Sequence, residues 1–229
     1  EEIADLRSGK LPEEFARLRG YFEQRMTASG DQLALDDPLD PNDLPLEPVV
    51  DPQGEPLRVS LALPGGSLTL SAWRAMVGRV PLYLLDADLP DNLPEMRAIT
   101  RNLYSADPEV RLRQEIVLGK GGVRLLRCLG IRPSAYHLNE GHAALAGLER
   151  IADLVGSEGL TFDEALALVR ATTVFTTHTP VAAGHDRFPV DLVRRYFSDV
   201  ATWLGVPWER FFELGQKPGD PDHFNMTGL

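Results

Sequence analysis

Two polar clusters follow short apolar segments in the second half of the chain, and together they contain four of its five histidines. The first cluster is residues 136–142 (Tyr-His-Leu-Asn-Glu-Gly-His), and the second extends from Phe175 through Pro180 to Asp186. The residues that lead into each cluster are of types that favour strands. Because ligands of parallel α/β proteins bind at the carboxyl ends of strands, we expect both clusters to lie on the ligand-binding face.

These residue types fit more than one kind of site. In a purely structural interpretation, Asn139 and Glu140 cap the following helix and the histidines bond local carbonyl groups. A metal site would draw imidazole and carboxylate ligands from His137, Glu140, His142, His178 and His185. However, the first cluster has the spacing His-x-x-Glu-x-His, which lacks the helical i, i+4 histidine pair that places two ligands on one face. Metal-dependent hydrolysis is therefore disfavoured.

Hydrophobic periodicity predicts the elements that position these clusters. The predicted strands are 57–63, 68–73, 80–85, 134–138 and 172–176, with a hairpin turn at 64–67 and a fully buried strand at 80–85. The predicted helices are 11–26, 109–129, 141–155, 161–169, 190–204 and 207–214, with a proline-rich connector at 36–45. Strands alternate with helices after Val80, which predicts a mainly parallel, helix-flanked sheet.

Local signals support two of these helices. Asp107 and Pro108 are typical of an N-cap and first turn, and Thr161 with Glu164 has the spacing of a capping box. The helix at 109–129 contains three glycines, Gly119, Gly121 and Gly122, which lower helix propensity. We therefore expect close packing of a neighbouring element against them.

Composition excludes several classes of protein. The chain has 229 residues, 43% of them hydrophobic, and a net charge of -11, which describes a globular protein that repels nucleic acid and anionic membrane surfaces. The single cysteine, Cys128, lies in an apolar helical context, so we expect a buried thiol and a reducing, cytoplasmic location. The chain begins at Glu1 and has neither a signal peptide nor a membrane-spanning run, and we expect it to be a piece of a longer protein.

The two clusters resemble a known family. The segments 136–143 (Tyr-His-Leu-Asn-Glu-Gly-His-Ala) and 174–180 (Val-Phe-Thr-Thr-His-Thr-Pro) are similar to the α-glucan phosphorylases, the family of glycogen and maltodextrin phosphorylases, and match its shorter bacterial and archaeal branch best. Further segments follow the order and rough spacing of that family: 80–86, 102–104, 111–115, 184–189 and 224–227. The resemblance covers about residues 21–229.

The resemblance implies an α/β fold of two Rossmann-like lobes, the GT-B type of glycosyltransferase, with the active site in the cleft between them. Residues 1–229 would form part of the N-terminal lobe, with a helix and connector at 1–50, a β-hairpin-rich insertion at 51–86 and an α/β segment at 87–229. The implied reaction transfers the non-reducing-end glucosyl unit of an α-1,4-glucan to inorganic phosphate, giving glucose 1-phosphate. The implied cofactor, pyridoxal phosphate, would be bound by the C-terminal lobe outside this chain, so the isolated chain would be inactive. The implied partners are glucan, phosphate and a second copy of the chain in a homo-oligomer, with no nucleic acid or membrane.

Carried over position by position, the resemblance places His178 where a main-chain carbonyl faces the transferred glucosyl unit, with Thr179 beside it. Asn139, Glu140 and His142 match an Asn-Asp-x-His segment near the sugar subsites, in which Glu140 replaces Asp and Gly141 replaces the Thr of the animal branch. Arg101 matches a cleft arginine.

The residues themselves suit this role. A developing oxocarbenium ion is stabilised by carbonyl or carboxylate oxygens, and sugar hydroxyls are recognised by hydrogen bonds. Two alternatives stay open: a nucleotide-sugar glycosyltransferase of the same architecture, and a non-catalytic glucan-binding module. A pyridoxal-binding lysine in the flanking sequence would distinguish the first from a phosphorylase.

Overall fold

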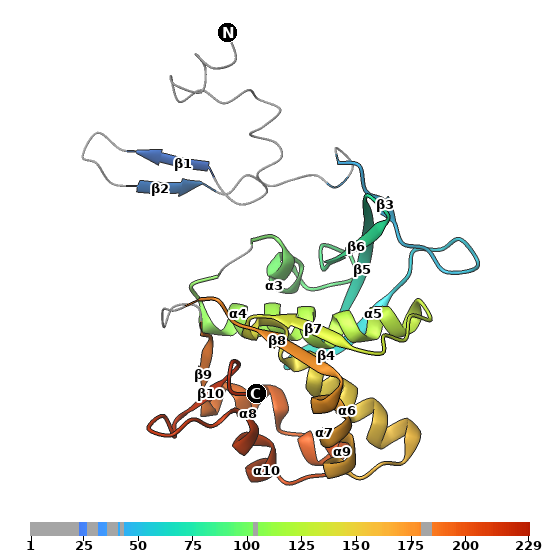
Figure 1. The fold of residues 1–229 in the computed structure, drawn as a ribbon. Coiled ribbons are helices and arrows are strands. Elements are labelled where there is room, and N and C mark those ends of the chain that lie inside the picture. The colour runs from blue at the N-terminus through green and yellow to red at the C-terminus, as the bar shows by residue number, and fades with distance from the viewer. Residues whose placement is uncertain (1–22, 27–31, 36–40, 42–43, 103–104, 180–184) are drawn as a thin grey trace.

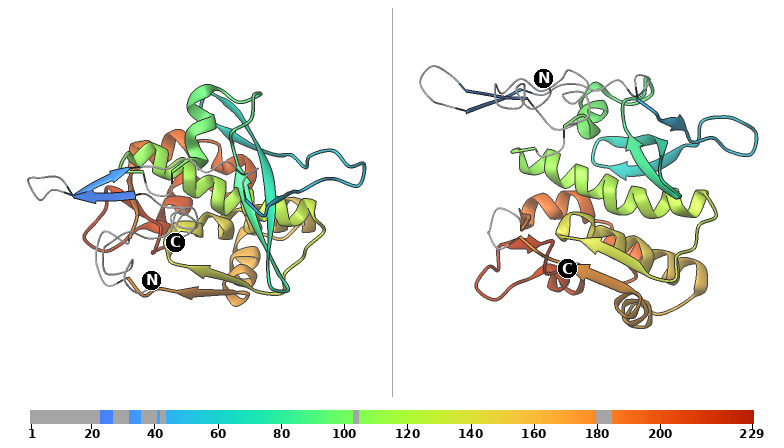
Figure 2. Two further views of the ribbon diagram at one scale, coloured as in Figure 1. Left: turned by 90° about the horizontal axis from the view of Figure 1, so that it is seen from above. Right: turned by 45° about the horizontal axis from the view of Figure 1, so that its top comes forward.

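The computed structural model describes residues 23–26, 32–35, 41, 44–102, 105–179 and 185–229. One long helical segment crosses the middle of the molecule, with an antiparallel sheet on one side and a helix-rich α/β part on the other (Figures 1 and 2). The fold is therefore mixed α/β, as the sequence predicts.

The antiparallel sheet consists of β3 (Glu47–Pro48), β4 (Val59–Leu63), β5 (Gly66–Val77) and β6 (Val80–Asp86). The predicted hairpin is confirmed, because Leu63 pairs with Gly66 across the turn. Side chains of β4 alternate strictly between buried and exposed, so one face of this sheet covers the core.

The burial predicted for the strand at 80–85 is wrong. β6 pairs with β5 in antiparallel register, and Leu82 is 48% exposed. A continuous apolar run indicates a strand with two covered faces, whereas one face of β6, with Val80, Leu82 and Leu84, is exposed in the described structure.

The long helical segment comprises α4 (Pro108–Ile116), a π-helical turn η3 (Val117–Gly121) and α5 (Gly122–Cys128). Asp107 caps its start by accepting hydrogen bonds from two backbone N–H groups, as predicted. Two of the three glycines do lie at close contacts. A Cβ at Gly119 would stand 2.7 Å from the backbone nitrogen of Ala146, and one at Gly121 would stand 3.0 Å from a methyl carbon of Leu70. The helix therefore packs on both sides at this turn.

Two predictions for this helix are wrong. A Cβ at Gly122 would meet no atom within 4 Å, so packing does not explain that glycine. Cys128 is exposed, since it lies in the last turn of α5, where the helix leaves the core.

The α/β part is organised around β7 (Tyr136–Asn139) and β8 (Thr173–Thr176), which pair in parallel. A 3-10 turn η4 (Gly141–Ala143), α6 (Leu145–Glu158) and α7 (Phe162–Ala171) connect the two strands, and the predicted capping box at Thr161 is present. This crossover matches the predicted strand–helix–strand order. Parallel pairing is restricted to these two strands in the described part of the chain, so the expected mainly parallel sheet is not seen there.

The remaining elements are short. They are β1 (Glu23–Met26), β2 (Gln32–Leu35), α3 (Pro94–Arg97), η2 (Ala98–Thr100), β9 (Arg187–Pro189), α8 (Val190–Phe197), α9 (Val200–Leu204), α10 (Trp208–Phe212), η6 (Glu213–Gly215) and β10 (His223–Asn225). The single helix predicted at 190–204 is wrong, because it breaks at Ser198 and Asp199 into α8 and α9. The helix predicted at 11–26 is wrong at residues 23–26, which pair with β2 as an antiparallel strand, and its earlier part lies outside the described residues. The connector at 36–45 also lies mostly outside them.

In the part of the chain described here, no helix combines the length and the apolar character that crossing a bilayer requires.

Candidate functional site

The two polar clusters predicted from the sequence meet at the carboxyl ends of β7 and β8. The parallel register pairs Asn139 with Thr176, and the backbone N–H of Glu140 donates to the Thr176 carbonyl at 2.8 Å. The residues that follow each strand therefore lie side by side, and the predicted juxtaposition is confirmed.

Glu140 is the centre of this arrangement, and its side chain points into the protein. It is only 3% exposed. Its Oε1 accepts from the backbone N–H of His178 at 2.8 Å, from the backbone N–H of Thr179 at 3.0 Å and from the Thr179 hydroxyl at 2.9 Å. Its Oε2 accepts from the Thr177 hydroxyl at 3.0 Å. The hydrogen bond from the His178 backbone is the largest cause that lowers the pKa of Glu140, to about 2, so this carboxylate is ionised at neutral pH.

The backbone at this position is unusual. Glu140 has φ 61° and ψ -177°, a region that essentially only glycine adopts without strain, and it has the only positive φ of any non-glycine residue in the described part of the chain. The next residue, Gly141, is a glycine for a steric reason. A Cβ at Gly141 would lie 3.0 Å from the Thr227 backbone nitrogen and 3.1 Å from the Met226 carbonyl carbon. Glycine therefore allows the C-terminal residues to approach β7.

His178 and Asn139 form the exposed side of the cluster. The His178 side chain is 63% exposed, its Nε2 lies 3.0 Å from Asn139 Oδ1, and its Nδ1 lies 3.1 Å from Glu140 Oε1. The imidazole thus reaches across to the end of the neighbouring strand, β7. Asn139 is exposed as well, so its amide group faces solvent and is accessible to a ligand.

His142 belongs to a separate cluster, together with Arg111, Glu115 and Asp186. Asp186 Oδ2 lies 2.9 Å from both Arg111 Nη2 and His142 Nδ1, and Arg111 Nε lies 3.2 Å from Glu115 Oε1. These residues come from α4, from η4 and from the segment before β9. The cluster therefore links three elements beside the strand ends.

The cluster shifts the pKa values of its members strongly. Burial raises the pKa of Glu115, which is 1% exposed, to about 8. The hydrogen bond to Asp186 raises the pKa of His142 to about 9. Burial of Asp186 opposes its ionisation, but hydrogen bonds from His142 and Arg111 hold its pKa well below its usual range. At neutral pH, a neutral Glu115 accompanies a charged His142 and an ionised Asp186.

Within the described residues, the five residues weighed as metal ligands from the sequence do not come together as one ligand group. His137 Nε2 lies 2.7 Å from the Thr176 hydroxyl, and His185 Nδ1 lies 2.9 Å from the Thr227 hydroxyl, so these rings bond local groups. Glu115, His142 and Asp186 do lie close enough to share a cation. The Arg111 guanidinium stands 2.9 Å from Asp186 Oδ2 and supplies positive charge to this group.

Arg101 is not part of either cluster. It is exposed at the end of η2, and within the described residues no hydrogen bond or ion pair joins it to Asn139, Glu140 or His178. Conversely, no role was predicted for Glu115 from the sequence. The available signal was its i, i+4 spacing from Arg111 on a helix with several buried apolar positions.

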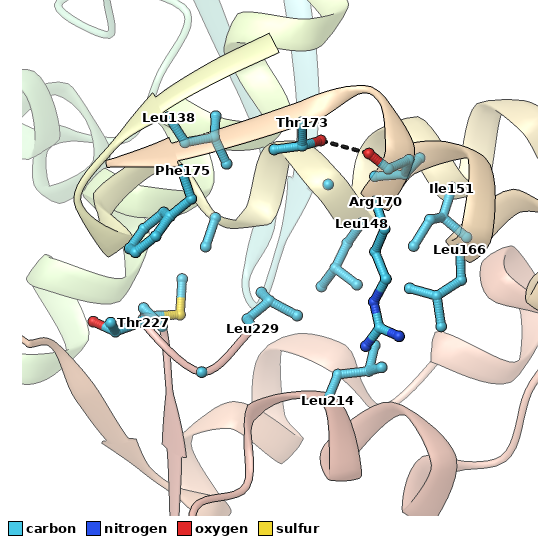
Figure 3. Close-up of a pocket in the computed structure, with 15 residues that line it drawn as sticks. Leu138, Leu148, Ile151, Leu166, Arg170, Thr173, Phe175, Leu214, Thr227 and Leu229 are labelled. Atoms are coloured by element: carbon cyan, nitrogen blue, oxygen red, sulfur yellow. Dashed lines mark hydrogen bonds between the residues drawn. The ribbon is translucent and has the colours of Figure 1, made fainter. Parts of the chain in front are cut away.

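A cavity of about 280 Å³ lies between the β7–β8 pair, α6 and α7, and the last residues of the chain (Figure 3). Leu138 and Phe175 line it from the strands, and Leu148 and Leu229 lie across from them. It is lined mainly by apolar side chains, and Asn139, Glu140 and His178 do not line it. This cavity is a gap in the apolar packing beneath the strands and does not contain the polar clusters.

Fold and site together describe an α/β protein segment with a polar, hydrogen-bonded surface at the ends of its parallel strands. No family model matches the chain. Curated proteins do: it is 47% identical over 223 residues to a glycogen phosphorylase of Mycobacterium tuberculosis, which covers 92% of this chain and 26% of that protein. It is 45% identical over 210 residues to a maltodextrin phosphorylase of Thermococcus litoralis, covering 92% of this chain and 24% of that protein. A glycogen phosphorylase of Aquifex aeolicus is 35% identical over 227 residues, with 99% of this chain and 33% of that protein covered.

Over most of its length, the chain is therefore similar to glycogen and maltodextrin phosphorylases of several organisms. It spans about a quarter to a third of the length of these curated relatives. The resemblance inferred from the strand-end segments is thereby confirmed.

Proposed function

We propose that this chain is part of the N-terminal lobe of a cytoplasmic α-1,4-glucan phosphorylase with the GT-B architecture. The complete protein transfers the non-reducing-end glucosyl unit of glycogen or maltodextrin to inorganic phosphate and releases glucose 1-phosphate. The observation that carries this proposal is the 47% identity over 92% of the chain to a glycogen phosphorylase.

The geometry of the strand ends supports a glucosyl-facing role. Asn139 and His178 are exposed side chains with donors and acceptors that suit sugar hydroxyls. The strand ends are also free of cationic arginine or lysine side chains in the described contacts of Glu140 and His178, which favours a site where positive charge develops. The Thr177–Thr179 backbone supplies the carbonyl oxygens.

The pyridoxal phosphate that this activity implies does not fit the described residues. Attachment of its aldehyde requires an accessible lysine, and the ammonium of Lys120 lies 4.1 Å from the Trp203 ring centroid and 3.6 Å from Glu149. Lys217 lies in a β-bridge with Asp220. Neither is bonded to the strand-end cluster within the described part of the chain, so we assign the cofactor to residues outside it and derive no step through it.

The experiment is phosphorolysis of maltodextrin by the full-length protein, with release of glucose 1-phosphate measured. We expect His178→Asn to keep the main chain and lose only part of the rate. His178→Pro should lower the rate of phosphorolysis much further, because it removes the backbone N–H that donates to Glu140. Asn139→Leu should lower the rate by roughly one to two decades by leaving buried partners in the sugar complex unpaired.

Circular dichroism checks that each variant folds. An Asn139→Leu variant that folds and turns over at the wild-type rate would remove Asn139 from the site. Wild-type turnover of a nucleotide sugar, without any release of glucose 1-phosphate from glucan and phosphate, would replace the phosphorylase with the alternative glycosyltransferase.

A further inference from the structure

The inward-facing Glu140 carboxylate has a geometry that side-chain contact with substrate does not explain. Its Oε1 receives two consecutive backbone N–H groups, those of His178 and Thr179, together with the Thr179 hydroxyl. Four of the carboxylate's contacts therefore lie on the loop that leaves β8, counting the Thr177 hydroxyl on Oε2. With 3% of its surface exposed, Glu140 has little left to offer a sugar.

These two hydrogen bonds fix the direction of two carbonyl groups. The described peptide bonds are all trans, and in a planar trans peptide the C=O points opposite to the N–H. Because the N–H groups of His178 and Thr179 both point at Glu140, the carbonyl oxygens of Thr177 and His178 both point away from it.

We propose that Glu140 is a positioning residue, which aims the main-chain carbonyls of Thr177 and His178 at the transferred glucosyl unit without touching the sugar itself. This rests on the proposed function. The residue acts through the backbone of the β8 exit, and its own carboxylate remains buried behind that backbone.

The charge and the strain at Glu140 both fit this role. An ionised carboxylate oxygen accepts several hydrogen bonds at once, which a neutral amide oxygen does less strongly. The backbone conformation of φ 61° and ψ -177° is unfavourable for a side chain with a Cβ, and such outliers persist where surrounding contacts over-determine them. Here, the contacts are the bonds that hold the β8 exit.

The test uses Glu140→Gln in the full-length protein, which keeps the size of the side chain and removes its charge. We expect kcat for phosphorolysis to fall roughly ten- to hundredfold, with KM for maltodextrin changed less than about twofold. The loss should be the same across the pH range from about 6 to 9, because Glu140 stays ionised there. Glu140→Asp, which keeps the charge but is one methylene shorter, should fold and retain more activity than Glu140→Gln.

Glu164→Gln is the matched control. Glu164 also accepts from a backbone N–H and a threonine hydroxyl, both of Thr161, at 2.9 and 2.7 Å, but it does so at the start of α7. This variant should keep the wild-type kcat and KM.

Amide hydrogen exchange provides a readout that does not depend on activity. In Glu140→Gln, the His178 and Thr179 amides should exchange at least roughly tenfold faster, while the Glu140 amide, bonded to Thr176, stays protected. Unchanged exchange at His178 and Thr179 would overturn the positioning role, and so would a raised KM with normal kcat, which would mean direct sugar binding. If the wild-type full-length protein catalyses no phosphorolysis of maltodextrin, the proposed function itself is refuted, whatever the exchange rates show.

Discussion

Substitution of Gly119 by alanine tests whether the long helix is pressed against α6 as tightly as the structure indicates. The added Cβ would lie 2.7 Å from the Ala146 backbone nitrogen, 2.9 Å from Leu145 Cβ and 3.0 Å from the Leu145 carbonyl carbon. Two of these three atoms are backbone atoms of the α6 region, so relief requires the helices to separate rather than one side chain to rotate.

The expected magnitude follows from two opposing effects. Overpacking of this kind destabilises by about 1–3 kcal/mol, and replacement of a helical glycine by alanine recovers up to about 1 kcal/mol. With backbone atoms this close, we expect a net loss of about 2 kcal/mol. Gly122→Ala is the internal control, because its Cβ would meet nothing within 4 Å. It should stabilise by about 0.5–1 kcal/mol through helix propensity alone.

The assay is thermal and urea unfolding of this chain and its two variants. For a chain of this size, about 1 kcal/mol corresponds to a shift in Tm of about 2–4 °C, so Gly119→Ala should melt about 4–8 °C lower and Gly122→Ala slightly higher than the parent. If both variants were stabilised equally, the glycines would be interchangeable, and the close crossing of η3 and α6 would be refuted.

Three further predictions concern individual side chains. The pKa of Glu115 is about 8 in the folded protein and about 4.5 in the unfolded chain, so this group lowers the stability of the fold as pH rises from about 5 to 8. Glu115→Gln should therefore make Tm depend less on pH in that range, and an unaltered slope of Tm against pH would contradict this reasoning. Asp186→Asn should lower the pKa of His142 from about 9 toward 6.5, measured by NMR titration, and an unmoved pKa would disprove the bond's role. Cys128 should react fully with a thiol reagent in native buffer, whereas protection until unfolding would contradict its exposure.

The sequence predicted the strand-end geometry well because that geometry follows from local patterns. β7, α6, α7 and β8 each show a clear period or cap, and short parallel strands linked by helices bring their carboxyl ends to one edge. The neighbours of an element depend on the rest of the fold, and for this reason β6 was assigned to the interior although Leu82 is half exposed. An apolar run does not reveal whether another strand lies beside it.

The clusters of charged groups were harder to predict. Arg111 and Glu115 lie four residues apart in α4, but their partners His142 and Asp186 are distant in sequence, and only the packing of α4 against η4 brings them together. Glu140 was predicted to be a substrate-binding residue, yet its direction depends on a positive φ that is favourable only for glycine. The role of its side chain as an anchor for the backbone therefore emerges only from the structure.

The segment from Glu140 to His142 shows why these residue types occur together. Glu140 holds the chain that leaves β8 at His178 and Thr179, and His142 binds Asp186, which lies just before β9. Between them, Gly141 leaves room for the backbone of the last residues of the chain. Three consecutive residues thus fix both described ends of the connection between β8 and β9 and the approach of the C-terminal segment. Each position makes its contact in a different way. Glu140 uses a long carboxylate, Gly141 has no side chain to block the approaching backbone, and His142 uses a charged imidazole. The segment that resembles a sugar-binding motif is consequently built mostly of residues that hold neighbouring backbone in place, and under the proposed function the exposed Asn139 and His178 are the residues that would meet the ligand.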